Sequence, residues 1–266
     1  MTEKNENFPN ALEAVVLVAA LFLVEYLVGA ALSDMRGWLE MDSNELGGMI
    51  MVLANGIVFT VVMQYKGLKY GDLFHASPSS ISATMAVLLP AIVLTVPLLT
   101  LVGQLLVGLL VWLFPLSDSE AAMFGDMSSG RFGMVVVSCI LAPVLEEMLF
   151  RGLILRSFLR QYSRWSAIIG SATLFGFAHM NLYQYVVALM LGIFLGWLYE
   201  RTRSLLPSMA LHAAYNTALT AEVLSGAADG QDGAGVNSSF TWALALVLGI
   251  AGIVMLRRLL LPAPNR

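Results

Sequence analysis

Residues Leu145–Gly152 read LEEMLFRG and lie inside a mostly apolar run, Met134–Leu159. The run is long enough for a transmembrane helix, because about 20 predominantly apolar residues span the hydrocarbon core of a bilayer. A charged side chain at that depth costs about 3 kcal/mol on insertion scales. Because Glu146, Glu147 and Arg151 lie within neighbouring turns of one such helix, we interpret them as functional.

The composition indicates an integral membrane protein. Of the 266 residues, 58% are hydrophobic and 12% are charged, whereas a soluble domain carries about 25% charged residues. No polar stretch is long enough for a separate soluble domain, so we expect a single membrane domain over residues 1–266. The formal net charge is −4 and the basic residues are scattered. This excludes a nucleic-acid partner and leaves the lipid bilayer as the expected surrounding.

Hydropathy divides the chain into apolar segments of about the length of a membrane span. We therefore expect an all-α, polytopic membrane helix bundle of about eight transmembrane helices around an intramembrane hydrated cavity. The expected spans are Ala11–Leu32, Leu46–Gln64, Thr84–Phe114, Phe132–Leu159, Trp165–Met180, Tyr183–Tyr199, Leu205–Leu224 and Phe240–Leu260.

Basic residues near the span ends predict the orientation, because cytoplasmic loops carry an excess of lysine and arginine. With eight spans, most of the basic residues lie on the same side of the membrane as both termini. This predicts that the N- and C-termini are cytoplasmic. We expect the plasma (inner) membrane of a bacterium. The basic residues on that side are Lys66, Lys69, Arg156, Arg160, Arg164, Arg201, Arg203, Arg257 and Arg258.

The spacing within LEEMLFRG predicts different roles for its two glutamates. Glu147 and Arg151 are four residues apart, so on a helix they share a face and can pair. Glu146 is rotated by about 100° from Glu147 and can point into a cavity. A carboxylate that no arginine holds is suited to act as a general base on water.

Two later apolar segments each carry a histidine with a partner four residues away. In FGFAHM, Phe175 can pack against His179, whose imidazole could orient a water molecule or shuttle a proton. In LHAAYN, His212 and Asn216 could form an oxyanion hole, or could hold a ligand or a metal. Residue counts from the flanking arginines give these groups a similar depth, so we expect them to converge on one hydrated pocket.

Other polar residues lie at membrane depth in the expected spans. Glu25 has no matching partner in its own helix, and we expect it to form a local hydrogen bond or to lie at the interface. Asn55 and Gln104 are expected to hydrogen-bond between helices, as polar amides do in membranes.

The motifs EEMLFR, FGFAH and HAAYN occur in this order within a core segment, residues 138–220. Together they resemble the signature of the CPBP family, the CAAX-protease and bacteriocin-processing membrane proteins that are also called Abi proteins. The resemblance implies a helical fold with a water-filled cavity in the membrane. It also implies an endopeptidase whose partner is a membrane-associated protein or peptide substrate, such as a prenylated CAAX protein.

The resemblance further implies a role for each motif residue. Glu146 would activate the water, and His179 would assist that water or carry protons. His212 and Asn216 would stabilise the oxyanion. The supporting residues would be Glu147, Arg151 and Phe175.

The residues leave metal dependence open. Glu146, His179 and His212 could supply a zinc site, but the HExxH pattern, which places two histidines on one helix turn, is absent. Asn216 is a poor zinc ligand, and Arg151 disfavours a nearby dication. We therefore favour glutamate-dependent hydrolysis without a metal or another cofactor, with zinc-dependent hydrolysis as the alternative.

Two other classes of function compete with a protease. A non-catalytic membrane immunity or scaffold protein could keep the fold, although it would not need the histidines. A proton-coupled transporter could also place glutamate and histidine in the membrane. Such transporters usually have inverted repeats with interrupted helices, and we find no such symmetry in the sequence.

Overall fold

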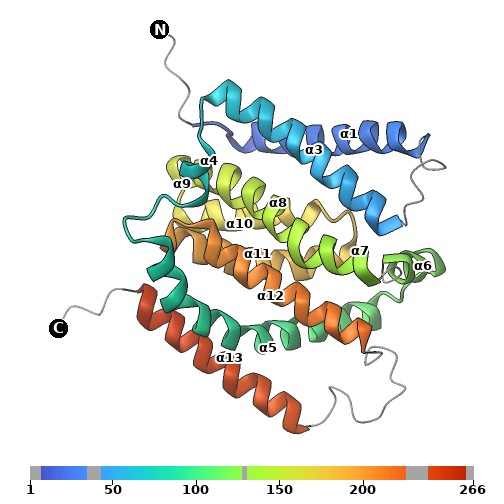
Figure 1. Ribbon diagram of the computed structural model, residues 1–266. Coiled ribbons are helices and arrows are strands. Elements are labelled where there is room, and N and C mark those ends of the chain that lie inside the picture. Colours follow the sequence, from blue (N-terminus) through green and yellow to red (C-terminus); the bar gives the residue numbers. More distant parts are fainter. Residues whose placement is uncertain (1–6, 35–42, 128–130, 226–238, 262–266) are drawn as a thin grey trace.

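The computed structural model describes residues 7–34, 43–127, 131–225 and 239–261, and every regular element in these ranges is a helix (Figure 1). This confirms the predicted all-α fold. The helices are α1 (Ala11–Ser33), α3 (Ser43–Lys66), α4 (Tyr70–Phe74), α5 (Ile81–Leu113), α6 (Asp118–Met127), α7 (Arg131–Val136), η1 (Val137–Leu141), α8 (Ala142–Glu147), η2 (Met148–Leu155), α9 (Arg156–Gln161), α10 (Arg164–Phe177), α11 (Leu182–Thr202), α12 (Leu205–Leu224) and α13 (Ser239–Leu260).

The helices are arranged in layers (Figure 1). On one side α1 packs against α3, and on the other side α13 packs against α5. Between these pairs lie α10, α11, α12 and the long helix that runs from α7 to α9. Apolar side chains form one core around η2, α1, α3 and α10, and a second core between α5, α11 and α12. The helices that carry the three motifs therefore occupy the middle of the bundle.

Five helices among the described residues are long and apolar enough to cross a membrane, namely α1, α3, α5, α11 and α13. The other predicted spans, Phe132–Leu159, Trp165–Met180 and Leu205–Leu224, are helical but do not qualify by length and composition. The first is divided by π-helical segments, and α10 in the second has only 14 residues. These three segments contain the polar motifs, which lower their hydropathy. Polar groups in membranes face the bundle interior, so we expect these helices to lie inside the bundle.

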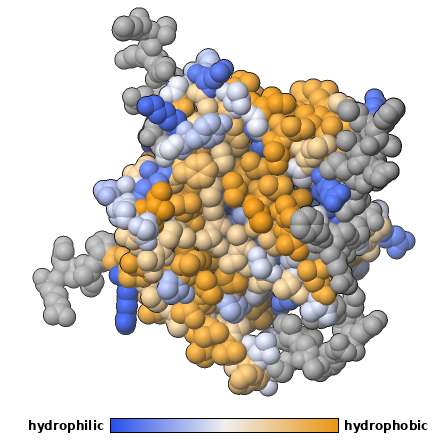
Figure 2. Space-filling view, viewed as in Figure 1, coloured by the Kyte–Doolittle hydropathy of each residue, from blue (hydrophilic) through white to orange (hydrophobic). Residues whose placement is uncertain are grey.

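Apolar side chains cover much of the outside of the bundle. Figure 2 shows hydrophobic residues over most of one face, with hydrophilic residues gathered toward its edges. Large apolar side chains such as Leu23 of α1 and Val247 of α13 are exposed. A surface of this extent is unfavourable in water and suits lipid, so the chain is a multi-pass membrane protein.

Short polar side chains begin several helices by accepting backbone hydrogen bonds that the first helical turn leaves open. Asn10 and Glu13 form a capping box at the start of α1. Ser163 and Ser204 cap α10 and α12. Asn181 accepts two backbone hydrogen bonds from the first turn of α11, and α10 and α11 pack against each other on either side of this residue.

The helix that carries the two adjacent glutamates is not a regular α-helix. Two π-helical segments, η1 and η2, flank α8. Such segments shift the backbone hydrogen bonds by one residue and often occur at functional sites. In η2 the Phe150 carbonyl accepts a hydrogen bond from Ser171 Oγ of α10 at 2.8 Å. A side chain of a neighbouring helix therefore helps to hold the irregular segment.

Glycine permits the close approach of α13 to α5. A Cβ at Gly252 would lie 2.7 Å from the Thr95 backbone nitrogen and 2.9 Å from the Ala91 carbonyl oxygen. Because these backbone atoms cannot move without α5, Gly252→Ala should destabilise the fold by about 1–3 kcal/mol. Gly56→Ala is the control, since nothing lies within 4 Å of a Cβ there. We expect only Gly252→Ala to lower the thermal unfolding midpoint, and equal midpoints would contradict this packing.

Candidate active site

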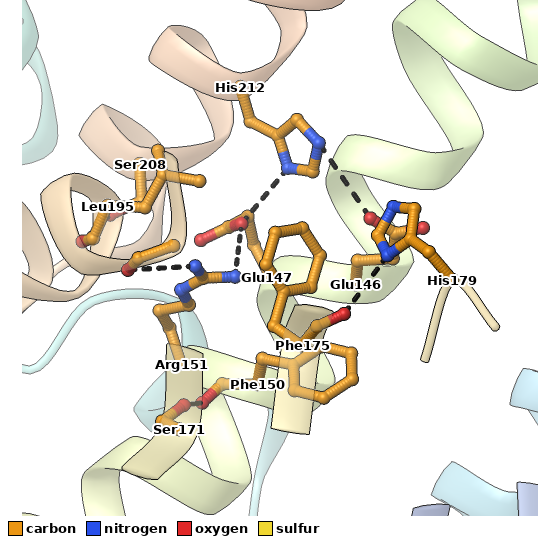
Figure 3. Close-up of polar contacts among 11 residues, drawn as sticks. Glu146, Glu147, Phe150, Arg151, Ser171, Phe175, His179, Leu195, Ser208 and His212 are labelled. Carbon is orange, nitrogen blue, oxygen red and sulfur yellow. Dashed lines mark hydrogen bonds and ion pairs between the residues drawn. The ribbon is translucent and has the colours of Figure 1, made fainter. Parts of the chain in front are cut away.

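Glu147 and Arg151 form a buried ion pair in the middle of the bundle (Figure 3). Arg151 Nη1 lies 2.8 Å from Glu147 Oε1, and the two side chains are 1% and 0% exposed, respectively. The pairing predicted from the spacing of four residues is therefore present. Removal of either partner would leave a charge buried without compensation, which is strongly unfavourable.

Two further contacts hold the Arg151 guanidinium. Nη2 donates to the Gly192 carbonyl of α11 at 3.1 Å, and the guanidinium carbon lies 4.5 Å from the centre of the Phe175 ring of α10. A cation over an aromatic face is attracted by the negative charge of the ring face. Arg151 thus connects η2 to α10 and α11 as well as pairing with Glu147.

His212 of α12 contacts both glutamates of α8 (Figure 3). Its Nδ1 lies 3.0 Å from Glu147 Oε1, and its Nε2 lies 3.7 Å from Glu146 Oε2. Because Glu147 is paired with Arg151 as an anion, the carboxylate accepts and Nδ1 donates. The imidazole therefore presents Nε2 to Glu146.

His179 follows the end of α10, where the backbone orients its imidazole. Its Nδ1 lies 3.0 Å from the Phe175 carbonyl oxygen, so Nδ1 donates and Nε2 is left as an acceptor. The Phe175 ring meets both histidines edge to face, with centroid distances of 5.2 Å to His179 and 5.7 Å to His212. The predicted packing of Phe175 against His179 is confirmed, and the same ring also supports His212.

A cavity of about 130 Å³ lies beside Glu146. Its polar lining consists of Glu146, His179, Glu25 of α1 and Asn55 of α3, and the other side chains around it are apolar. A water molecule needs roughly 10–15 Å³ of such volume, so several can fit. The Glu146 side chain is 24% exposed, whereas Glu147 is fully buried. Glu146 therefore meets the cavity, as the sequence predicts.

Asn216 of α12 donates through Nδ2 to the Ser138 carbonyl of η1 at 2.8 Å. In this π-helical segment each backbone N–H donates to the carbonyl five residues earlier, as the Ala142 N–H does to the Val137 carbonyl. By the same spacing the Ser138 carbonyl would accept from residue 143, but this residue is Pro143, which has no N–H. Asn216 thus satisfies an acceptor that the proline leaves open. One N–H of its amide remains, and its role as an oxyanion donor stays a prediction.

Two parts of the site are not evident from the sequence. The sequence predicts a local hydrogen bond or an interfacial place for Glu25, yet Glu25 lines the cavity and interacts electrostatically with Glu146. Its position at membrane depth is a signal that could have identified it. Gly192 takes part through its backbone carbonyl, and no residue pattern predicts such a contact.

The two membrane amides behave differently. Asn55 donates to the Met51 carbonyl of its own helix at 2.9 Å, so this hydrogen bond does not join helices as predicted. Gln104 of α5 donates to Glu222 of α12 at 2.7 Å, which confirms the predicted interhelical bond.

Among the residues predicted as possible zinc ligands, Glu146 lines a cavity with His179 and lies 3.7 Å from His212 Nε2. Within the described ranges, no group of three or more histidine, cysteine, aspartate or glutamate side chains is arranged to hold a metal ion. His212 Nδ1 contacts Glu147 while Nε2 faces Glu146, an arrangement that histidine ligands of metals also adopt, so metal dependence stays a prediction.

Comparison with known families agrees with this geometry. A family model described as type II CAAX prenyl endopeptidase Rce1-like matches residues 128–218. The matched segment contains the buried ion pair, both histidines of the site and Asn216. This segment is similar to that family, and the match agrees with the resemblance of its motifs to the CPBP family.

One curated relative, named "Putative membrane peptidase YdiL", comes from Bacillus subtilis (strain 168) and is 30% identical over 84 residues. The aligned part makes up 32% of this chain and 34% of the relative, so the chain spans about a third of the length of the relative it matches. No solved structure matches the chain.

Removal of Arg151 should destabilise the protein far more than removal of a surface arginine. Arg151→Ala leaves the buried Glu147 carboxylate without its guanidinium, at a cost of about 3–5 kcal/mol. Arg164 pairs with Glu200 and is 34% exposed, so Arg164→Ala should cost about 1 kcal/mol or less. Denaturant unfolding of the purified variants measures both values. Equal stability of the two variants would argue against the buried pair.

Proposed function

We propose that the chain is an intramembrane endopeptidase in which Glu146 activates water for attack on a peptide carbonyl. The proposal is carried by the position of Glu146, which lines the cavity with His179 and lies 3.7 Å from His212 Nε2. The Rce1-like family match and the peptidase relative support the class of reaction.

In the first step, Glu146 accepts a proton from a cavity water while the water oxygen bonds to the substrate carbonyl carbon. The electron pair of the C=O bond moves to the carbonyl oxygen and forms an oxyanion. His179 orients the water through its Nε2 acceptor. General base catalysis of this kind contributes about 10²- to 10⁴-fold to the rate.

The second part of the proposal assigns oxyanion stabilisation to His212. Glu147 fixes the ring by accepting from Nδ1, so a proton on Nε2 would point toward the space beside Glu146. With that proton the buried charges balance, because two carboxylates face one guanidinium and one imidazolium. The remaining N–H of Asn216 is the second donor. Donors arranged in advance for a developing negative charge contribute strongly to catalysis.

The tetrahedral intermediate then collapses. Glu146 returns its proton to the nitrogen of the leaving group, the C–N bond breaks, and the electron pair returns from the oxyanion to the carbonyl carbon. The products are a new carboxyl terminus and a new amine. The chain residues return to their initial protonation states, so the cycle needs no further reactant.

We also propose that both termini face the cytoplasm of a bacterial cell and that the substrate is a membrane-associated protein or peptide. In Figure 1 the C-terminal ends of α3, α9 and α13 lie on the side of α4. The last turns of these helices carry Lys66, Arg160 and Arg257, and such a basic side is typical of the cytoplasmic face. A prenylated CAAX-type C-terminus is the substrate class that the family description names. Another C-terminal or leader segment is the alternative.

Glu146→Gln should abolish cleavage without loss of folding, because an amide has a similar shape but cannot accept the proton. Mass spectrometry of peptide termini in cells with wild type or Glu146→Gln should reveal ends that only the wild type produces. Glu200→Gln is the control, since Glu200 pairs with Arg164 and Arg201 away from the cavity. Identical termini in wild-type and Glu146→Gln cells would refute the proposed reaction.

Asn216→Ala should lower kcat by about 10²- to 10³-fold, the loss typical for one oxyanion donor. KM should change little, because the donor acts mainly on the transition state. Steady-state cleavage of a peptide identified by the terminal comparison measures both constants. A wild-type kcat in a variant whose stability alone is reduced would show that Asn216 only supports η1.

A further inference from the structure

One wall of the cavity has no part in the reaction described above. Glu25 of α1 lines this cavity together with Glu146 and His179. No hydrogen bond or ion pair holds the Glu25 carboxylate in the part of the chain that the structure describes, and its electrostatic neighbour is the like charge of Glu146. Glu25 is therefore a carboxylate at membrane depth without a structural partner to explain it.

The polar groups that face the cavity are mainly hydrogen-bond acceptors. The two carboxylates accept when ionised, and His179 Nε2 accepts because Nδ1 donates to the Phe175 carbonyl. The remaining walls are apolar, including Leu21, Phe22 and Phe150. Charges interact more strongly in such surroundings than in water.

A protonated His212 would offset the charge of Glu146, which it contacts at 3.7 Å, but not that of the second carboxylate at the cavity, Glu25. Arg151 does not offset it either. Arg151 is fully buried and is committed to Glu147 and to the Gly192 carbonyl, and it does not line the cavity. A substrate group with a positive charge would therefore be attracted into the cavity, whereas a carboxylate there would be repelled by Glu25 and Glu146.

We propose that Glu25 is a specificity-determining residue, which selects substrates with an ammonium or guanidinium group beside the scissile bond and rejects acidic ones. This proposal rests on the proposed function, because it assumes that a peptide segment occupies the cavity. The charge of Glu25 acts on substrate binding, whereas Glu146 acts on the water. A change at Glu25 should therefore affect substrate preference through KM.

The test uses internally quenched peptides that span a cleavage site mapped by comparison of peptide termini in cells that contain or lack the protein. Each position next to the scissile bond carries lysine, glutamine or glutamate in turn, and kcat and KM are measured with the full-length purified protein. At one position the wild type should cleave the lysine peptide with at least about tenfold higher kcat/KM than the glutamate peptide, which corresponds to about 1.4 kcal/mol.

Three variants separate charge from structure. Glu25→Gln should reduce the lysine-to-glutamate ratio below about threefold, mainly by raising KM for the lysine peptide. Glu25→Asp should keep the preference, because it retains the charge. Tyr26→Phe is the control on the same helix, since Tyr26 is 73% exposed and should leave the ratio unchanged.

The outcomes distinguish this proposal from the proposed function. An unchanged ratio in Glu25→Gln, or a wild type with no preference between the peptides, would overturn the role of Glu25. Cleavage by Glu146→Gln at the wild-type rate would instead overturn the role of Glu146, and the ratios in the Glu25 variants would still report on specificity. A loss of preference in Glu25→Asp equal to that in Glu25→Gln would also contradict the charge mechanism.

Discussion

The structure of the site depends on the ion pair between Glu147 and Arg151, which is buried in the middle of an apolar bundle. The pair makes Glu147 an anion that can accept from His212 Nδ1, and this contact turns His212 Nε2 toward Glu146. Arg151 also contacts the α11 backbone and the Phe175 ring of α10. One interaction thus sets the orientation of the residues to which we assign the chemistry.

Adjacent residues in the sequence take different parts because a helix rotates by about 100° per residue. Glu147 faces the interior and is fully buried, whereas Glu146 meets a cavity with room for several waters. The same cavity brings in Glu25 from α1, which lies in the outer α1–α3 pair. The site is therefore completed by a helix that none of the three motifs includes.

Helical spacing was sufficient to predict the Glu147–Arg151 pair and the Phe175–His179 contact, because both are local. The long apolar segments were sufficient to predict the all-α fold. The contacts of His212 with Glu147 and of Asn216 with Ser138 join distant segments, and spacing carries no information about them. Hydropathy also counts apolar residues without seeing which helices are shielded from lipid. It also does not show where a helix ends or becomes π-helical, and for that reason it counts α10, which has only 14 residues, and the divided span Phe132–Leu159 as complete spans.

The most direct test of this account is a double-mutant cycle on the free energy of unfolding with Glu147→Gln, Arg151→Met and the double variant. If the two side chains form a buried pair, each single change leaves the other charge uncompensated, so the double variant should be at least about 2 kcal/mol more stable than the sum of the single losses predicts. Additive losses would show that the two residues do not interact, and the proposed orientation of His212 would lose its basis.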